Sequence, residues 1–209
     1  MGGSVFCKGK VALPQIKCAC LLDTASLMRY TETNLHHANL PERRELMRDR
    51  LQEAIELRST GHAEEARTIL LDLVALSPDD AEINYQTAGV HDTLGREREA
   101  VPFYVQAIEQ GLSGPDLEGA FLGLGSSYRT LGAYQSAEET FRRGMATFPH
   151  NRALQVFLAM TLYNLRRYQE AMELLLTTLA ETTSDETILQ YKRAILFYAP
   201  QLDQVWDAQ

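Results

Sequence analysis

A short pattern of small residues recurs at nearly constant intervals along most of the chain. The recurring turn position is occupied, at intervals of 34, 37 and 34 residues, by Gly61, Gly95, Gly132 and Arg166. An alanine follows each of them five residues later, at Ala66, Ala100, Ala137 and Ala171. Between these points apolar residues recur at three-to-four spacing, which predicts helices. A fixed period of this length indicates stacked repeats, and it limits the possible folds more than any other feature.

Each period predicts two helices joined by a short turn and closed by turn residues such as those of 77–80. We expect four repeats, at about 47–80, 81–114, 118–151 and 152–185. The longer middle interval is explained by three extra residues in the loop 111–119, where added length costs little. The expected fold is therefore all-α, with a repeat region at 39–185.

The third repeat carries the clearest motif. Its key residues are Phe121, Leu124, Gly125, Tyr128, Ala137, Phe141 and Pro149. This pattern resembles the tetratricopeptide repeat, a 34-residue helix-turn-helix unit written W-x2-L-G-x2-Y, then A-x3-F, then P. The chain resembles the members of a small bacterial group of such proteins, often called group 5. The resemblance implies a right-handed superhelical solenoid of about four repeats, followed by a C-terminal helix.

The sizes of the recurring residues support the resemblance. One position of the first helix is small in every repeat, at Ala54, Ala88, Gly125 and Ala159. Another position, on the second helix, is large, at Leu70, Tyr104, Phe141 and Leu175. Small residues let two helices approach closely, and large ones fill the space between repeats. One residue does not fit, because Pro102 falls inside a predicted second helix and lacks a backbone N–H.

The resemblance implies that the first helices line a concave groove that binds peptides or helices of other proteins. The groove positions map onto Leu51, Ile55, Arg58, Tyr85, Gly89, Asp92, Leu122, Ser126, Arg129, Val156, Met160 and Tyr163. Each of these is equally compatible with an ordinary, partly exposed helix position. The lining is apolar and aromatic with scattered charge, which favours an amphipathic helix or an extended apolar segment. Family members that capture chaperone C-termini use lysine and asparagine, which are absent from the matching positions here.

The C-terminal segment, 186–209, is predicted to be a capping or docking helix with a tail. It is apolar on more than one face, through Ile188, Leu189, Tyr191, Ile195, Leu196, Phe197 and Tyr198. One face is expected to cover the fourth repeat. The second face is either part of the same cap or docks into a groove, of its own chain or of a second copy. Docking between copies would give a two-fold dimer.

The first 38 residues predict a disordered leader, since they lack caps and sustained periodicity. All three cysteines lie here, at Cys7, Cys18 and Cys20. A soft metal bound by these thiols, with His36 or His37, is the alternative to incidental thiols in a flexible leader. We predict the flexible leader, no metal and no cofactor.

Composition and motifs exclude several classes of function. The formal net charge is −8, which disfavours nucleic-acid and anionic-membrane surfaces. No apolar run is long enough to span a membrane, and there is no phosphate-binding loop, HExxH motif or GxSxG elbow. We therefore predict a cytoplasmic, non-enzymatic protein that binds a peptide or helix. A self-associating homodimeric scaffold is the alternative, and an RNA-binding helical repeat is a third, disfavoured possibility.

Overall fold

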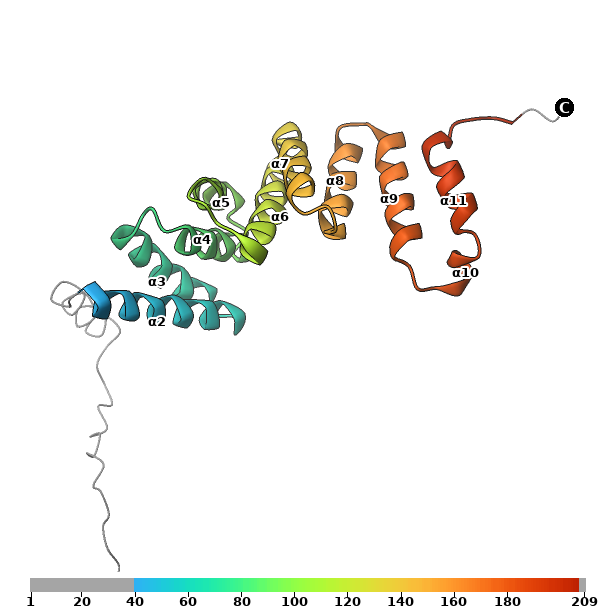
Figure 1. Ribbon diagram of the computed structural model, residues 1–209. Coiled ribbons are helices and arrows are strands. Elements are labelled where there is room, and N and C mark those ends of the chain that lie inside the picture. The colour runs from blue at the N-terminus through green and yellow to red at the C-terminus, as the bar shows by residue number, and fades with distance from the viewer. Residues whose placement is uncertain (1–39, 207–209) are drawn as a thin grey trace, which may run out of the picture. The chain divides into compact units, whose positions relative to one another are not determined.

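The computed structural model describes residues 40–206, and every regular element within that range is a helix (Figure 1). The predicted leader, with its cysteines and its alternative metal site, lies outside the described residues. The elements are α2 (Leu40–Ser59), α3 (Ala63–Leu76), α4 (Ala81–Thr93), α5 (Glu97–Glu109), α6 (Gly114–Thr130), α7 (Tyr134–Thr147), α8 (Arg152–Asn164), α9 (Tyr168–Thr182), α10 (Glu186–Leu189), α11 (Lys192–Tyr198) and the 3-10 helix η1 (Ala199–Gln201). A boundary between two compact units falls within α2, after Leu46. The second unit, from Met47 onward, contains the helix pairs.

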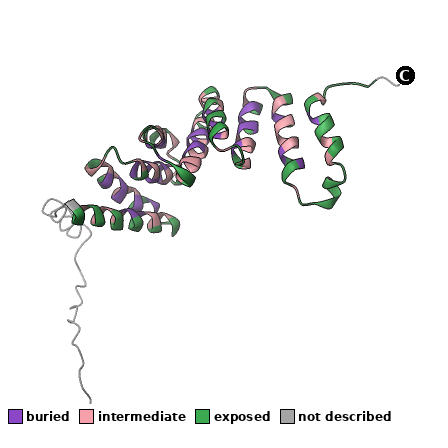
Figure 2. Cartoon of the chain, viewed as in Figure 1, coloured by how far each residue is buried: buried purple, intermediate pink, exposed green. Residues whose placement is uncertain are grey.

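The helices pack in chain order as four pairs, which confirms the predicted all-α repeat fold. From α3 to α9, each helix contacts the next, and α6 also contacts both α4 and α8, so that first helices of successive repeats touch. Side chains of α2 and α3 share one core cluster, through Leu51, Ala54, Ala66 and Ile69. Buried residues therefore form a band along the facing sides of the helices (Figure 2).

The turn between the two helices of each repeat has the same backbone geometry all four times. Gly61, Gly95 and Gly132 have φ values of 90°, 68° and 77°, and Arg166 has a φ of 61°. In each turn the following residue donates its N–H to the carbonyl five residues earlier, as His62 does to Leu57 at 2.8 Å. This bond closes a Schellman motif, which needs a left-handed residue and favours glycine. The alignment of Arg166 with the three glycines is confirmed.

The small residues lie where two helices approach most closely. Ala54, Ala88 and Ala159 are fully buried, and Gly125 is buried as well. A Cβ atom at Gly125 would overlap the ring of Phe141, itself fully buried. The sequence prediction for this position is confirmed, because only a hydrogen atom fits between the backbone and that ring.

Arginines that follow the turn reach back to the preceding repeat. Arg96 pairs with Glu64, and Arg167 pairs with Glu138 at 2.7 Å. Arg142 joins the second cluster by pairing with Glu138 and with Glu170. Burial alone raises the pKa of Glu138, but hydrogen bonds from Arg142 and Arg167 outweigh it and lower that pKa below the ordinary value. Ion pairs thus connect repeat one to two and repeat three to four.

Two segments differ from the expectation of regular helices. Pro102 is the sixth residue of α5, so the helix does not begin late enough to avoid it, and its ring faces solvent. The C-terminal segment is not one helix, because it breaks between α10 and α11. At the break, the N–H of Tyr191 donates to Ile188 three residues back, at 2.9 Å, and a new helix starts. α11 and η1 then pack on α9, and Gln169 donates a hydrogen bond to the carbonyl of Pro200 at 2.8 Å.

Candidate functional site

The twelve predicted groove residues lie on α2, α4, α6 and α8, and we call this surface the first-helix face. Leu51 is only 8% exposed and belongs to the first core cluster, so it offers almost no surface to a ligand. Met160 and Tyr163 are exposed, at 38% and 63%. The others are half-buried, namely Ile55, Arg58, Tyr85, Gly89, Asp92, Leu122, Ser126, Arg129 and Val156. The face is therefore most open at the fourth repeat.

The side chain of Arg58 crosses from α2 to α4. Its Nη1 atom donates to the carbonyl of Gln86 at 3.4 Å, and a Cβ at Gly89 would collide with the guanidinium. Gly89 thus makes room for Arg58 and presents no side chain to a ligand. Burial, followed by the charge of Asp116, raises the pKa of Tyr85, and the positive charge of Arg58 opposes this only in part.

Asp92 is held by hydrogen bonds from two other elements. The hydroxyls of Tyr104 on α5 and Ser127 on α6 each donate to one of its oxygens, both at 2.8 Å. Burial raises the pKa of Asp92, and these two bonds partly oppose the shift. Burial, followed by the charge of Asp92, raises the pKa of Tyr104 far above its ordinary value. The three groups form a closed polar cluster that joins the second and third repeats.

Two glycines of α6 provide space for tyrosines from the preceding repeat. A Cβ at Gly119 would overlap the hydroxyl of Tyr85, and one at Gly123 would overlap the hydroxyl of Tyr104. The rings of these tyrosines lie 6.3 Å apart, centre to centre. Sequence reasoning missed Gly119, Gly123 and Tyr104 as parts of this face, although glycine inside a helix is a general signal of close approach.

Arg129 occupies the same place in repeat three that Arg58 occupies in repeat one. Its Nε atom is buried and has no hydrogen-bond partner among the described residues. Neither arginine forms an ion pair with any carboxylate in residues 40–206. The first-helix face therefore holds two half-buried positive charges that the fold itself does not neutralise.

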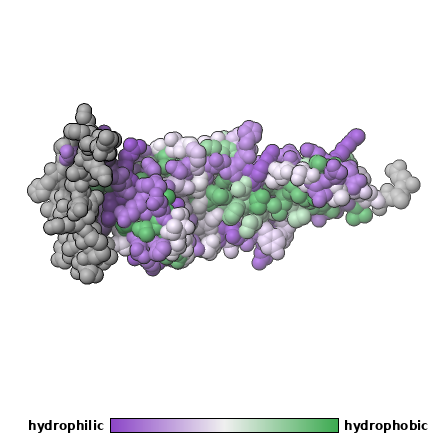
Figure 3. Space-filling view, turned by 90° about the horizontal axis from the view of Figure 1, so that it is seen from below, coloured by the Kyte–Doolittle hydropathy of each residue, from purple (hydrophilic) through white to green (hydrophobic). Residues whose placement is uncertain are grey.

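At the fourth repeat the face is aromatic. The rings of Tyr163 on α8 and Tyr168 on α9 meet edge to face, with centroids 5.1 Å apart. Tyr168 is 51% exposed and Met160 lies one turn before Tyr163. Figure 3 shows an apolar area on one side of the molecule over the region of α8 and α9. The expected apolar and aromatic lining describes this repeat better than the three before it.

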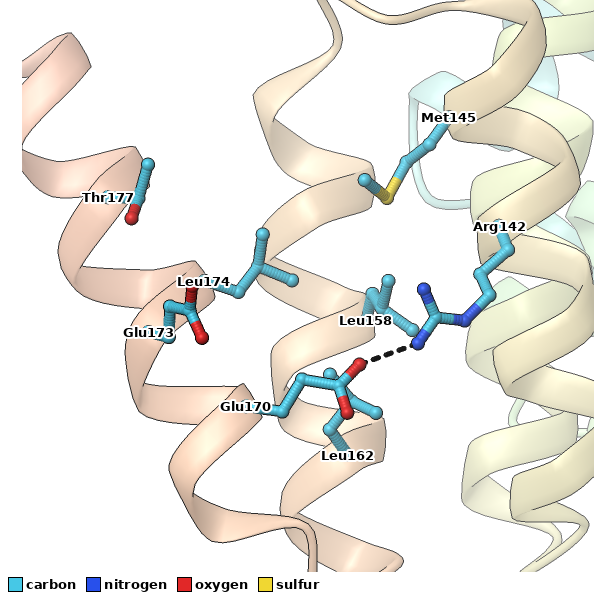
Figure 4. A pocket seen from close by; sticks show the side chains of 8 residues that line it. All are labelled: Arg142, Met145, Leu158, Leu162, Glu170, Glu173, Leu174 and Thr177. Carbon is cyan, nitrogen blue, oxygen red and sulfur yellow. Dashed lines mark hydrogen bonds and ion pairs between the residues drawn. The ribbon is translucent and has the colours of Figure 1, made fainter. Parts of the chain in front are cut away.

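A separate hollow of about 300 Å³ lies between α7, α8 and α9 (Figure 4). Met145, Leu158, Leu162 and Leu174 give it apolar walls. The Arg142–Glu170 ion pair, 2.7 Å long, lies beside it and is drawn as a dashed line in Figure 4. Glu173 and Thr177 of α9 complete its lining.

The C-terminal residues predicted for self-association are largely exposed. Tyr191, Phe197 and Tyr198 are 60%, 53% and 48% exposed, while Ile188 and Ile195 are half-buried. The ring of Phe197 contacts those of Tyr198 and Trp206, with centroids 5.1 and 5.8 Å apart. Trp206 was missed in the sequence analysis because it lies beyond the last periodic residue.

Comparison with known proteins settles the family. The family described as Tetratrico peptide repeat matches residues 81–202, more than half of the chain. The chain belongs to the tetratricopeptide repeat family. No curated protein sequence matches it.

Solved structures with similar folds include several tetratricopeptide repeat proteins. The MamA protein is 16% identical with a TM-score of 0.60, over 81% of this chain and 85% of that one. A tetratricopeptide repeat protein from Parabacteroides merdae is 17% identical with a TM-score of 0.61, over 84% and 66%. PilF from Pseudomonas aeruginosa is 15% identical with a TM-score of 0.57, over 78% and 74%. At such identities these likenesses show the fold alone.

Two further observations concern what the described tetratricopeptide repeats contain. Within residues 40–206, no helix is both long and apolar enough to cross a membrane. In the same range, no group of three or more histidine, cysteine, aspartate or glutamate side chains could hold a metal ion.

Proposed function

We propose that this tetratricopeptide repeat protein is a non-catalytic interaction module that holds a segment of another protein against its first-helix face. One observation carries the proposal: Met160 and Tyr163 are 38% and 63% exposed on a first helix whose other side is buried in the core. When a partner covers exposed aromatic side chains of this kind, a large apolar area is removed from water, which favours binding.

The arrangement of the polar groups supports a role without catalysis. The hydroxyls of Tyr104 and Ser127 are both engaged as donors to Asp92. The ring of His91 is buried and stacked on Phe103, with centroids 5.5 Å apart. A nucleophile and a base within reach of a common ligand are what catalysis would need.

A peptide selection tests the proposal. The full chain would be used to select from a library of random peptides, and binding of the selected peptides would be measured by fluorescence anisotropy. We expect Tyr163→Ser to weaken binding about 10-fold or more, as for an interface hot spot. Gln106→Ser on α5 is the matched control, because Gln106 is exposed on a second helix. Equal binding by both variants, or no selected peptide at all, would contradict the proposal.

A second candidate function is self-association through the C-terminal segment, favoured by a specific observation. Phe197, Val205 and Trp206 are 53%, 84% and 54% exposed and lie close together in the chain. Contiguous apolar surface of this kind marks interaction sites in many proteins. Because α11 and η1 cover α9, truncation would uncover a second apolar surface, so substitution is the better test.

Light scattering after size exclusion checks this second function. We expect a dimer for the full chain and a monomer for the Phe197→Asp, Trp206→Asp double variant, since buried carboxylates are costly. Gln135→Asp together with Thr147→Asp, on the exposed side of α7, is the control and should remain dimeric. A full chain that is monomeric at tens of micromolar would contradict the proposed self-association.

A further inference from the structure

Arg58 and Arg129 stand apart from the other half-buried arginines. From Met47 onward, the half-buried arginines that have a carboxylate partner are Arg50, Arg67, Arg96 and Arg152. Arg58 and Arg129 have none, and both occupy the same place on the first helix of their repeats. Arg58 has only a long hydrogen bond to a carbonyl, at 3.4 Å, and the buried Nε of Arg129 has no acceptor among the described residues.

The acidic residue at the same place in the intervening repeat is bound elsewhere and forms no ion pair with Arg58 or Arg129. This residue is Asp92, whose two oxygens already accept hydrogen bonds from Tyr104 and Ser127 at 2.8 Å. Those bonds come from the neighbouring helices α5 and α6, so they tie the carboxylate into the fold. Among the described residues no ion pair joins Asp92 to Arg58 or Arg129, although an aspartate lies between them in the repeat order.

A half-buried guanidinium has lost part of its hydration without gaining a carboxylate partner, which is unfavourable. A carboxylate supplied from outside would restore charge-assisted hydrogen bonds, which are short and strong, and which arginine can make in pairs. We propose that the segment bound by the first-helix face is acidic and that its Asp or Glu side chains pair with Arg58 and Arg129. This inference rests on the proposed function and specifies the chemistry of its partner.

The net charge of the chain does not contribute to the preference for an acidic segment. The chain has a net charge of −8, so its overall field repels an acidic peptide and gives no long-range attraction. Recognition must then come from short-range pairing at the two arginines. Surface pairing of this type weakens as salt is added, because ions screen it.

The random-peptide selection on the full chain supplies the first readout. We expect the selected peptides to contain more Asp and Glu than the unselected library. An enriched set without that excess would overturn the inference, while the proposed function would stand if those peptides still depended on Tyr163. No enriched peptide at all would overturn both.

Variants give the second readout, with one resynthesised peptide measured by fluorescence anisotropy. We expect Arg58→Gln and Arg129→Gln each to weaken binding about 10-fold or more, in line with a lost bond between charged groups. Arg98→Gln is the control, because Arg98 is exposed on α5 and has no ion pair among the described residues. It should bind within about 2-fold of the unaltered chain, as expected for a surface charge outside the site.

Further controls keep the result interpretable. Melting curves would establish that each variant is folded before its binding is compared. Replacing Glu and Asp by Gln and Asn in the peptide should cause the same loss on the unaltered chain and little further loss on the Arg58→Gln, Arg129→Gln double variant. Full binding by the neutral peptide, or equal binding by all arginine variants, would overturn the inference.

Discussion

Close contact between helices decides which single residues this fold tolerates. Gly125 lies against the ring of Phe141, and Gly144 lies where a Cβ would be 2.9 Å from the Cβ of Phe121. A rigid aromatic ring or a Cβ cannot move aside without shifting its helix. Gly89 differs, because the atoms facing it are the end of the flexible Arg58 side chain. Glycines in similar helices therefore have unequal importance.

The first prediction compares two Gly→Ala changes within helices. We expect Gly125→Ala to lower the free energy of unfolding by about 1–3 kcal/mol, because the added methyl overpacks the contact with Phe141. Gly89→Ala is the matched control and should be neutral or stabilising, since Arg58 can move and alanine favours a helix. Urea unfolding measures both. An equal loss in the two variants would contradict the role assigned to Phe141.

The second prediction concerns the turn of the fourth repeat. Arg166 has a φ of 61°, a conformation that costs a residue with a side chain about 1–2 kcal/mol relative to glycine. We expect Arg166→Gly to raise the free energy of unfolding by about 0.5–1 kcal/mol after the entropy cost of glycine is included. Gly95→Ala, at the equivalent turn, should lower it by about 1 kcal/mol. A destabilised Arg166→Gly variant would show that the arginine side chain contributes more than the strain removes.

These residues show what could be predicted from the sequence alone. The turn position of all four repeats was predictable, because the fixed period aligns Arg166 with Gly132 and so predicts the same turn for both. The role of Gly89 was not, because it depends on Arg58, a side chain that comes from another helix 31 positions earlier. The hydrogen bonds of Asp92 were unpredictable for the same reason, since no local pattern links it to Tyr104 and Ser127.

At the scale of helices, α4 carries a buried ionisable group whose surroundings disfavour its charge. Burial lowers the pKa of His91 below its ordinary 6.5, and Glu99, whose Oε2 is 3.3 Å from Nδ1, only partly opposes this. Arg67 and Arg96 also act to lower that pKa. The folded α4–α5 pair therefore favours a neutral imidazole stacked on Phe103.

The third prediction follows from the direction of this shift. Because the pKa of His91 is lower in the folded than in the unfolded chain, protonation favours unfolding. The stability linked to His91 is fully present above about pH 6.5 and is lost as the pH falls through the folded pKa. We expect the melting temperature to fall between pH 7.5 and pH 5.5, and to fall less in His91→Gln. An equal fall in His91→Gln and in the unaltered chain would contradict this role of His91.

The C-terminal segment shows where a periodic pattern is insufficient at this scale. Its apolar residues continue at helical spacing from Ile188 to Tyr198, and this spacing predicted one helix. The hydrogen bond from the N–H of Tyr191 to the carbonyl of Ile188, three residues back, lies at the end of α10. α11 begins after it, and α11 and η1 both contact α9. No glycine or proline lies at the break itself, so the local sequence carries no signal for it.

At the scale of the whole repeat array, three junctions join the four repeats by different chemistry. The first and third junctions have ion pairs, Arg96–Glu64 and Arg167–Glu138, made by the residue that follows each turn. The middle junction has an alanine, Ala133, at that place and uses the hydrogen bonds of Asp92 instead. In a repeat array each unit contacts mainly its neighbours, so each junction contributes separately to stability.

The unequal junctions have a consequence for how the array responds to salt. Ion pairs between partly exposed side chains stabilise by about 0.2–1 kcal/mol. Salt weakens them, because the screening length of charge interactions falls to about 3 Å at 1 M. The bond between Asp92 and Ser127 is shielded, since Ser127 is only 1% exposed. We therefore expect concentrated salt to weaken the first and third junctions by about 0.2–1 kcal/mol for each ion pair and to weaken the central junction less, so that salt makes the cohesion of the array more even along its length.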